Sequence, residues 1–533
     1  MKKKTVIALA TLLACGQGVW AQTTSFTVTA GVEEGTEEKP FLIENIADLN
    51  VLAADVNSGT DYSGVHFKLK ANLDYSGEAL SDTDEDGVTD SNFTPIGYGD
   101  ESDGKSFNGV FDGNGHYIKG ITVNTPSAAG VALFGYIAHP AEIRNLTLKD
   151  CSFTGNFEVG AIAGASSGSA TNSTFGIYDC TVESTVKVTA VTTTIESEDY
   201  PGTYAGGIIG FCGSLTVSDC TSAATVKGDE SVGGIAGHIT GSTLGGVIDN
   251  CFFSGSVTGG TEATEVGTIV GGRGPIDVEE GTIGTINLTL YDADGETIKN
   301  TTRLSNYNGL EGNVTLSGRT LYKDNSWNTI CLPFAMTAEQ VTAQLAPTKL
   351  MTLSTATFAE GTLTLNFADA TEIEAGKPYI IKWTGNTEWG NPTVTGVTVR
   401  SAAPADVEGT AANFHGIYTP YSTGGENKSM LYLGASNKLY YPSADMTINA
   451  FRAYFTLNGI EAGPASSSAP AAVRAFVLNF GDGDGATGIL SLSADSKDSE
   501  DNAAWYDMQG RRLSGKPTAS GIYINNGNKI VIK

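Results

Sequence analysis

The stretch Val232-Gly233-Gly234-Ile235-Ala236-Gly237 decides the fold, because similar segments stand before and after it. The other copies are Ala129–Gly135, Val159–Gly164, Ala205–Gly210 and Val266–Gly271. Each copy is a short apolar segment bounded by glycines, which is typical of a strand between tight corners. A unit this small cannot bury its own apolar face, so repeated units must stack on their neighbours.

A polar residue followed by cysteine is the second repeated mark. It occurs as Asp150-Cys151, Asp179-Cys180, Asp219-Cys220 and Asn250-Cys251. The cysteines are 29, 40 and 31 residues apart, so the period is near thirty with insertions. Units of this length made of short strands predict a parallel β-helix, whose coils stack at about 4.8 Å and align equivalent side chains in ladders. The cysteines are expected to point inward with the Ile and Val of the Gly-rich copies, and Asp150, Asp179 and Asp219 to stack outward.

The repeated cysteines are expected to be buried free thiols. Stacked coils place Cα atoms within disulfide range, so a disulfide ladder is the alternative. Equivalent side chains of parallel strands point the same way, however, and a free cysteine packs as a small apolar residue. No C-x-x-C pair occurs, which excludes the common zinc-site and thioredoxin-like motifs.

Residues 1–21 have the pattern of a signal peptide. Three lysines, Lys2–Lys4, precede the apolar run Val6–Ala14, and Val19-Trp20-Ala21 ends in a small residue suited to cleavage. The run is too short to span a membrane as a helix. We expect cleavage after Ala21, with lipidation of Cys15 as the alternative, and therefore an extracellular or outer-membrane surface location.

The charge balance narrows the choice of partners. Lys and Arg total 31 against 59 for Asp and Glu, which gives a formal net charge of −28. Such a chain repels nucleic acid and anionic lipid. It suits a soluble extracellular protein or one that binds cations.

Changes in composition divide the mature chain into five regions. They are a cap region with an Asp-rich insertion (22–108), β-helix repeats (109–280), an antiparallel β-sandwich (281–480), a solvated linker (481–503) and a strand-rich tail (504–533). One helix is predicted after Asn45, where apolar residues recur at helical spacing until Gly59. A second, short helix is predicted from the capping box of Thr337 and Gln340 to about Leu345.

Several segments resemble known families. Segments EEKPFLIENIADLNVLA and FNGVFDGNGHYIKGITV, with the Gly-rich copies, resemble secreted Bacteroidetes GLUG-repeat surface proteins. That resemblance implies a right-handed β-helix used as a scaffold or binding stalk. The tail, with Trp505–Arg512 and Lys529–Lys533, resembles the sorting domain of type IX secretion. It implies that the outer-membrane secretion machinery is a partner.

The Asp-rich insertion is the sharpest local motif. Oxygen ligands at alternate positions, with Gly87 for a tight turn, match the first part of a calcium loop. The expected ligands are Asp82, Asp84, Asp86, Asp90 and the carbonyl of Val88. Phe93 stands where a bidentate Glu would be, so the expected dissociation constant is about 10⁻⁴–10⁻³ M. The alternative is an acidic insertion that binds no metal.

The sequence predicts a non-enzymatic adhesion, binding or structural protein. Some immunoglobulin A peptidases carry GLUG repeats, but no two of the five histidines here stand four residues apart, which excludes the His-Glu-x-x-His zinc motif. The alternative is a carbohydrate-active β-helix enzyme, which would need carboxylates converging beside an exposed aromatic residue. A smooth face of Thr, Ser and Asn would instead favour binding or structure.

Corner insertions are the expected contact surface, since solenoids often bind through them. Two are predicted, Val188–Pro201 and Gly241–Gly246, both rich in Thr, Ser or Gly. The expected partner is a host glycan or an extracellular-matrix protein. Deleting Val188–Pro201 is expected to weaken adhesion and leave the fold intact.

Overall fold

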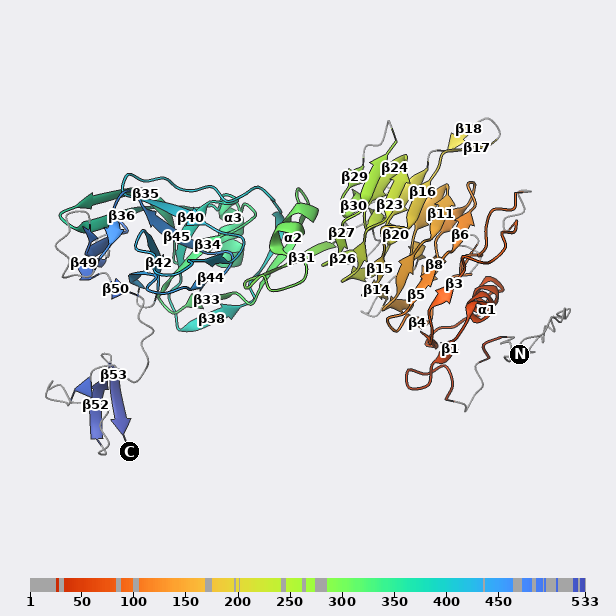
Figure 1. Cartoon of the computed structure of the whole chain (residues 1–533), viewed down its shortest axis with the longest axis horizontal. Helices are drawn as coiled ribbons and strands as arrows, with labels where there is room; N and C mark the ends of the chain where they lie inside the picture. The colour runs from red at the N-terminus through yellow and green to blue at the C-terminus, as the bar shows by residue number, and fades with distance from the viewer. Residues whose placement is uncertain are drawn as a thin grey trace. The chain divides into compact units, whose positions relative to one another are not determined.

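The computed structural model divides the chain into two compact units, Met1–Asn287 and Leu288–Lys533 (Figure 1). The structure describes residues 25–27, 33–82, 88–98, 105–167, 175–195, 198–200, 202–240, 246–260, 265–273, 285–434, 437–463, 472–481 and the backbone of strands within 486–494 and 505–532. The predicted signal peptide and most of the predicted linker lie outside these residues.

The first unit begins with a helical cap. Strand β1 (Phe41–Ile43) is followed by α1 (Ile46–Asn57), β2 (His66–Leu69) and β3 (Leu73–Asp74). Asn45 caps α1, and its side chain and that of Asp48 form a reciprocal capping box. Leu49, Leu52 and Val56 are buried on one face, as the spacing predicts.

Five coils of five strands each follow in the described part of this unit. The first two coils are β4 (Val110–Asp112), β5 (Tyr117–Lys119), β6 (Thr122–Asn124), β7 (Ala129–Val131), β8 (Phe134–Ala138), and β9 (Glu142–Arg144), β10 (Thr147–Lys149), β11 (Ser152–Gly155), β12 (Phe157–Gly160), β13 (Ala163–Ser167). The third is β14 (Gly176–Tyr178), β15 (Thr181–Val182), β16 (Lys187–Ala190), β19 (Thr203–Gly206), β20 (Ile209–Cys212), with the hairpin β17 (Thr193–Ile195) and β18 (Glu198–Tyr200) inserted. The last two are β21 (Thr216–Ser218), β22 (Thr221–Ser222), β23 (Thr225–Gly228), β24 (Glu230–Gly233), β25 (Ala236–Ile239), and β26 (Val247–Asp249), β27 (Phe252–Phe253), β28 (Ser256–Gly259), β29 (Val266–Gly267), β30 (Val270–Arg273).

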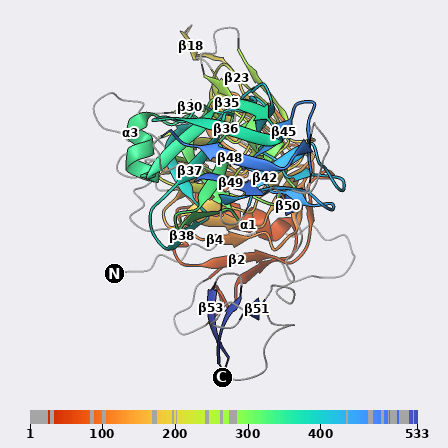
Figure 2. The ribbon, with the colours of Figure 1, turned by 90° about the vertical axis from the view of Figure 1, so that its left-hand side faces the viewer.

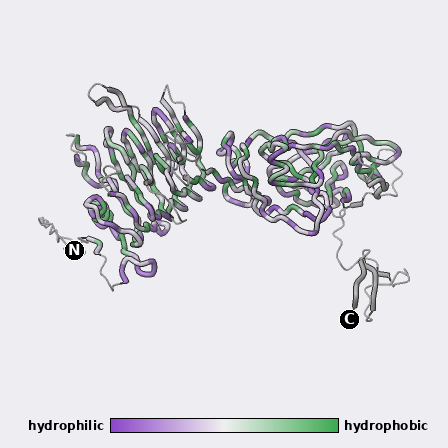
Figure 3. Tube along the Cα trace, turned by 180° about the vertical axis from the view of Figure 1, so that it is seen from behind, coloured by the Kyte–Doolittle hydropathy of each residue, from purple (hydrophilic) through white to green (hydrophobic). Residues whose placement is uncertain are grey.

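The coils stack in register, which confirms the predicted parallel β-helix. Val131, Val159, Ala205, Val232 and Val266 pair in one line, so the Gly-rich copies occupy equivalent positions. The first four of these residues are fully buried. Hydrophobic and hydrophilic residues alternate along the coils (Figure 3), as expected for strands with one buried face.

Glycine is required where the two strands of each Gly-rich copy meet. A Cβ atom on Gly206 would lie 1.8 Å from the carbonyl oxygen of Ile209, and one on Gly233 would lie 1.9 Å from that of Ala236. Any side chain at these positions would therefore overlap backbone atoms. The repeated glycines allow this tight corner in successive coils.

The Asp-Cys marks occupy two different corners, which corrects the predicted ladder. Thr147 pairs with Thr181, so the residue aligned with Cys180 is Leu146. Cys151 instead precedes Ser152, which pairs with Lys187 on the next sheet. The ladder that contains Asp179 and Asp219 therefore does not include Asp150. Both corners have the same Asp-Cys sequence because each needs a residue in the left-handed backbone conformation followed by a buried residue.

The second unit is a β-sandwich preceded by a strand pair. Its elements before residue 400 are β31 (Thr285–Tyr291, which begins in the first unit), α2 (Asn300–Asn306), β32 (Glu311–Ser317), β33 (Thr320–Lys323), β34 (Trp327–Cys331), α3 (Ala338–Gln340) with a π-helical turn (Val341–Leu345), β35 (Lys349–Ala359), β36 (Thr362–Asp369), β37 (Pro378–Lys382), β38 (Thr387–Gly390) and β39 (Thr393–Thr398). Those after it are β40 (Ala412–Gly416), β41 (Tyr421–Ser422), β42 (Met430–Leu433), β43 (Leu439–Tyr441), β44 (Thr447–Ile448), β45 (Ala453–Leu457), β46 (Glu461–Ala462), β47 (Ala472–Val473), β48 (Ala475–Asn479), β49 (Ala486–Ser491), β50 (Ser493–Ala494), β51 (Trp505–Tyr506), β52 (Gly521–Asn525) and β53 (Asn528–Ile532).

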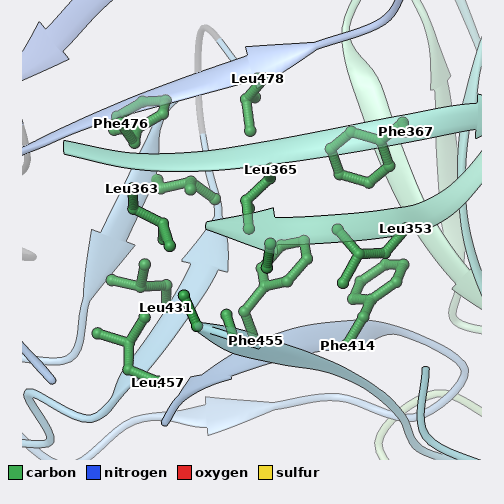
Figure 4. Packing of buried hydrophobic residues seen from close by; sticks show 14 of the residues in the cluster. Leu353, Leu363, Leu365, Phe367, Phe414, Leu431, Phe455, Leu457, Phe476 and Leu478 are labelled. Carbon is green, nitrogen blue, oxygen red and sulfur yellow. The ribbon is translucent and has the colours of Figure 1, made fainter. Parts of the chain in front are cut away.

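Two sheets enclose the core of the sandwich. One has the order β34-β37-β35-β36-β48-β49 and the other β40-β45-β42-β43-β50. Strands β35, β36 and β48 run side by side (Figure 2). Leu365 and Phe367 of the first sheet pack against Phe414 and Phe455 of the second (Figure 4). Most pairs of the second unit are antiparallel as predicted, but β36–β48, β43–β50 and β46–β47 are parallel.

The helix α2 was not predicted. Its residues, Asn300–Asn306, include few strong helix formers, and Lys299 provides no side-chain cap. Tertiary contacts hold it instead, since the buried Asn300 donates to the carbonyl of Tyr418 at 3.1 Å. The short helix at Thr337 is present with its capping box.

Candidate functional site

One outer face of the β-helix is lined mainly by hydroxyl side chains. It belongs to sheet β6–β11–β16–β23–β28, in which Val123, Phe153 and Val188 point into the core. The alternate residues form two outward ladders, Thr122–Ser152–Lys187–Thr225–Ser256 and Asn124–Thr154–Thr189–Lys227–Thr258. We call these ten residues the hydroxyl face. Each hydroxyl can donate and accept a hydrogen bond, so the face offers a regular array of polar contacts.

The hairpin β17–β18 projects from the coils beside this face (Figure 1). It follows β16, and Thr193 at its base donates a hydrogen bond to the carbonyl of Pro126. The predicted insertion, Val188–Pro201, begins too early, because Val188 and Ala190 lie in β16 and are buried. Deleting that whole range would remove core residues, so the expected tolerance of the fold to this deletion is wrong. Of the second predicted insertion, 241–245 lie outside the described residues.

A cluster of aromatic and acidic residues lies at another corner. We call Phe157, Tyr204, Phe211, His238 and Glu265 the notch cluster. The Tyr204 ring centroid is 4.9 Å from that of Phe157, 5.4 Å from Phe211 and 5.1 Å from His238. Sequence analysis missed the cluster, because its members come from four different coils.

Carboxylates surround Tyr204. Burial raises the pKa of its phenol, and the nearby charges of Glu158, Glu265 and Glu230 raise it further. Glu158 precedes Val159 of β12, and Glu265 precedes Val266 of β29. These two strands are three positions apart in the sheet. At about 4.8 Å per strand this separates their backbones by roughly 14 Å. Paired carboxylates of glycosidases are about 5–9.5 Å apart, so the ladder spacing does not favour such a pair.

The hydroxyl of Ser231, beside the notch cluster, does not form a nucleophile relay with His238 and Glu265. Ser231 donates to the carboxylate of Glu265, and the Nδ1 atom of His238 lies 3.8 Å from the same oxygen. Both groups thus face the acid. A nucleophile would instead have to pass its proton to an imidazole that a third group orients.

The predicted calcium ligands are only partly within the described chain. Asp84 and Asp86 lie outside it, whereas Asp82 and Val88 flank the gap and the Val88 side chain is exposed. The carboxylate of Asp90 accepts a hydrogen bond from Asn124 at 2.5 Å, which fixes it against the first coil. Among the described residues no group of three or more His, Cys, Asp or Glu is placed to hold a metal ion.

A ladder of left-handed residues explains the polar residue before each cysteine of one corner. Asn114, Asn145, Asp179, Asp219 and Asn250 all have φ between 51° and 54°. Asn and Asp adopt this conformation more readily than other non-glycine residues, because their side chains bond locally. The Asn250 amide donates to Asp219 at 2.6 Å. Burial and the charge of Asp219 raise the pKa of Asp179.

All six described cysteines are free and buried, which confirms the prediction made for the four repeated ones. Burial raises the pKa of the Cys151 thiol to about 11 and that of Cys212 to about 12. Thiols in this state are inert, since the thiolate is the nucleophile and the metal ligand. The cysteines therefore serve packing.

Comparisons with known proteins extend over part of the chain. Halomucin of Haloquadratum walsbyi is 34% identical over 140 residues, which are 26% of this chain and 1% of that protein. A candidate Gly-rich membrane protein of Evansella cellulosilytica is 31% identical over 146 residues, 27% of this chain and 14% of that protein. The chain thus spans a small fraction of these relatives' length. The names of these two relatives suggest a cell-surface or membrane location for the protein.

No family model matches the chain, so the resemblances to GLUG repeats and to a sorting tail stay predictions. A solved structure from Bacteroides ovatus, titled as a candidate immunoglobulin A1 protease, has 22% identity and a TM-score of 0.33. The alignment covers 48% of this chain and 66% of that one. None of the helices in the described part of the chain is long and apolar enough to cross a membrane.

Proposed function

We propose that the protein is exported to the cell surface or beyond, and that its β-helix binds a glycan or an extracellular-matrix protein without chemical turnover. The observation that carries this proposal is the hydroxyl face. Its outward residues are Thr, Ser, Asn and Lys, two from each coil, and none of the ten is a carboxylate. Such an array offers many weak hydrogen bonds and lacks the paired carboxylates that glycoside hydrolysis requires.

The location rests on separate support. The leader pattern of residues 1–21 favours export. The names of the relatives are compatible with a surface protein. The tail after residue 504 is the segment through which we expect contact with the outer-membrane secretion machinery.

A carbohydrate-active enzyme is the alternative function. The aromatic and acidic notch cluster is the feature that favours it, because Phe157 is 36% exposed beside Tyr204. The spacing of Glu158 and Glu265 along the stack counts against these two residues as a hydrolytic pair, and Glu230 of β24 with Glu265, which precedes the neighbouring strand β29, is the pair to test. We place binding ahead of turnover because the hydroxyl face extends over all five coils.

The test uses the mature protein and two changes, one in the hairpin β17–β18 and one on the hydroxyl face. In one variant residues 193–200 are replaced by a two-residue turn, and in the other Thr154 and Thr189 become Val, which keeps shape and strand propensity. Binding to immobilised fibronectin, laminin and a glycan array is then measured. We expect at least a tenfold weaker affinity for the bound partner and an unchanged melting temperature.

Thr364→Val is the matched control, since Thr364 is a half-buried strand residue of the other unit. Binding to none of the probes would contradict the proposal. So would an equal loss of affinity in the control.

We separately propose that the insertion at residues 82–90 binds calcium. Titration calorimetry at millimolar calcium should show heat that disappears in the Asp84→Asn variant. Equal heat in both proteins, or none in either, would refute the site.

A further inference from the structure

The outer face of sheet β40–β45–β42 in the second unit carries a row of rings. Phe414 and Phe455 point into the core, so the alternate residues His415 and Tyr454 face away from it. His415 and Tyr454 are directly paired across the two strands. Tyr421, from the short strand β41, extends the row, and we call these three residues the tyrosine row.

The rings of the tyrosine row are nearly parallel. The centroids of His415 and Tyr454 are 5.3 Å apart with 26° between planes, and those of Tyr454 and Tyr421 are 5.1 Å apart with 24°. Tyr454 is buried, whereas Tyr421 is 37% exposed. The row therefore ends in an aromatic ring that solvent can reach.

Oxygen atoms border the row. The Nδ1–H of His415 donates to the carboxylate of Asp406 at 2.7 Å, and its Nε2 lies 2.5 Å from the hydroxyl of Thr456. Burial raises the pKa of Tyr454, and the charges of Tyr421 and Asp406 raise it further. An aromatic surface thus lies next to both donors and acceptors.

We propose that the tyrosine row binds a neutral carbohydrate, with one face of a pyranose ring against Tyr421. Sugar C–H groups suit the negative face of an aromatic ring. The hydroxyl groups of Tyr421 and Tyr454 would bond the sugar's hydroxyl groups, and the Asp406 carboxylate would hold the His415 ring at the far end of the row. His415 is already held by two hydrogen bonds, so ordering its side chain costs little conformational entropy when a ligand binds. This preorganisation favours binding at the tyrosine row. The chain's net charge of −28 disfavours an acidic sugar.

Thr456, His415 and Asp406 have the connectivity of a nucleophile relay, in which the Thr456 hydroxyl would pass its proton to His415 and Asp406 would orient the imidazole. Acyl transfer would also require backbone donors for the oxyanion, usually including the amide after the nucleophile. That amide, of Leu457, already donates to the carbonyl of Ser429 at 2.8 Å. We therefore assign the relay to positioning the His415 ring, not to catalysis.

The test is native electrophoresis of the mature protein through gels that contain yeast α-mannan, laminarin, xyloglucan or polygalacturonate. We expect retardation by at least one of the three neutral polysaccharides and none by polygalacturonate. Tyr421→Ala should weaken the retardation at least tenfold. Tyr322→Ala is the control, because Tyr322 is 49% exposed on β33 of the same unit and should leave retardation unchanged.

Three results would overturn the proposal. They are no retardation by any neutral polysaccharide, an equal loss in the control, and hydrolysis of p-nitrophenyl acetate that Thr456→Ala abolishes. Melting curves of both variants check that the fold is kept. The variants Tyr421→Ala and Tyr322→Ala lie in the second unit, and the hydroxyl face lies in the first. Failure of binding at the tyrosine row is therefore distinguishable from failure of binding at the hydroxyl face.

Discussion

The β-helix and the sandwich bury their apolar residues in different ways. In the β-helix a core residue such as Val159 pairs with its own equivalents, Val131 and Ala205, in the neighbouring coils. In the sandwich Phe367, Phe414 and Phe455 meet from strands far apart in the sequence. A stacked array depends on nearest-neighbour contacts, whereas a shared core is disrupted as a whole by one cavity. Changes in the two units should therefore have separate effects.

Two intrinsic probes separate the units. Five of the six described cysteines lie in the first unit, while Trp327, Trp383 and Trp389 of the sandwich and Trp505 of the tail lie in the second. Thiol labelling therefore reports mainly on the β-helix, and tryptophan emission on the sandwich.

The largest expected effect concerns the thiols. Because burial raises the pKa of Cys151 to about 11 and of Cys212 to about 12, both thiols stay protonated at pH 8. We expect labelling by a disulfide reagent to be at least a hundredfold slower in the native protein than in urea. Rapid labelling of Cys212 in the native protein would show that the coils are open.

A cavity in the sandwich comes next. Phe414→Ala removes a fully buried ring that stacks on Phe455 with centroids 4.5 Å apart. The expected loss is about 3–5 kcal/mol in the free energy of unfolding, measured by tryptophan emission in urea. Thiol labelling of the β-helix should be unchanged, and a parallel increase in labelling would mean that the units unfold together.

A smaller loss is expected at the tight corner of the β-helix. Gly206→Ala places a Cβ atom on the carbonyl of Ile209, and overpacking of this kind costs about 1–3 kcal/mol. The thiols should then label faster, while tryptophan emission in urea stays as in the parent protein. Gly77→Ala, whose Cβ would meet no atom within 4 Å, is the control. Equal labelling rates for the two variants would contradict the assigned role of the corner.

The smallest effect is electrostatic. The folded protein raises the pKa of Asp179, so the folded state binds its proton more tightly than the unfolded state does. Stability is therefore lost as the pH rises from the unfolded pKa through the folded one. Asp179→Asn keeps a residue suited to the left-handed corner, as Asn250 does. It should add a few tenths of a kcal/mol at pH 7, after allowance for solvent screening, and nothing at a pH below both values.

Denaturation of the Asp179→Asn variant at both pH values is the measurement, with Asp150→Asn as the control at a different corner. An equal gain at low and neutral pH would show that the effect is not electrostatic.

Much of the β-helix could be predicted from its sequence, since repeated glycines and apolar residues mark equivalent positions. The error at Asp150 arose because two corners share one local requirement, a left-handed residue before a buried one. The sites were much harder to predict. Tyr421, Tyr454 and His415 are separated in the chain and carry no motif, so only strand pairing brings them together. Contacts of this kind depend on register, which single-sequence patterns do not specify.

The central claim is that the β-helix binds without turning over its partner. Its most direct test is to incubate the mature protein with the polysaccharides of the glycan array and to measure both binding and new reducing ends or unsaturated products. We predict binding to the hydroxyl face and no product above a heat-denatured control. Product formation that a single carboxylate substitution abolishes, such as Glu265→Gln, would contradict the account and assign a catalytic role to the notch cluster.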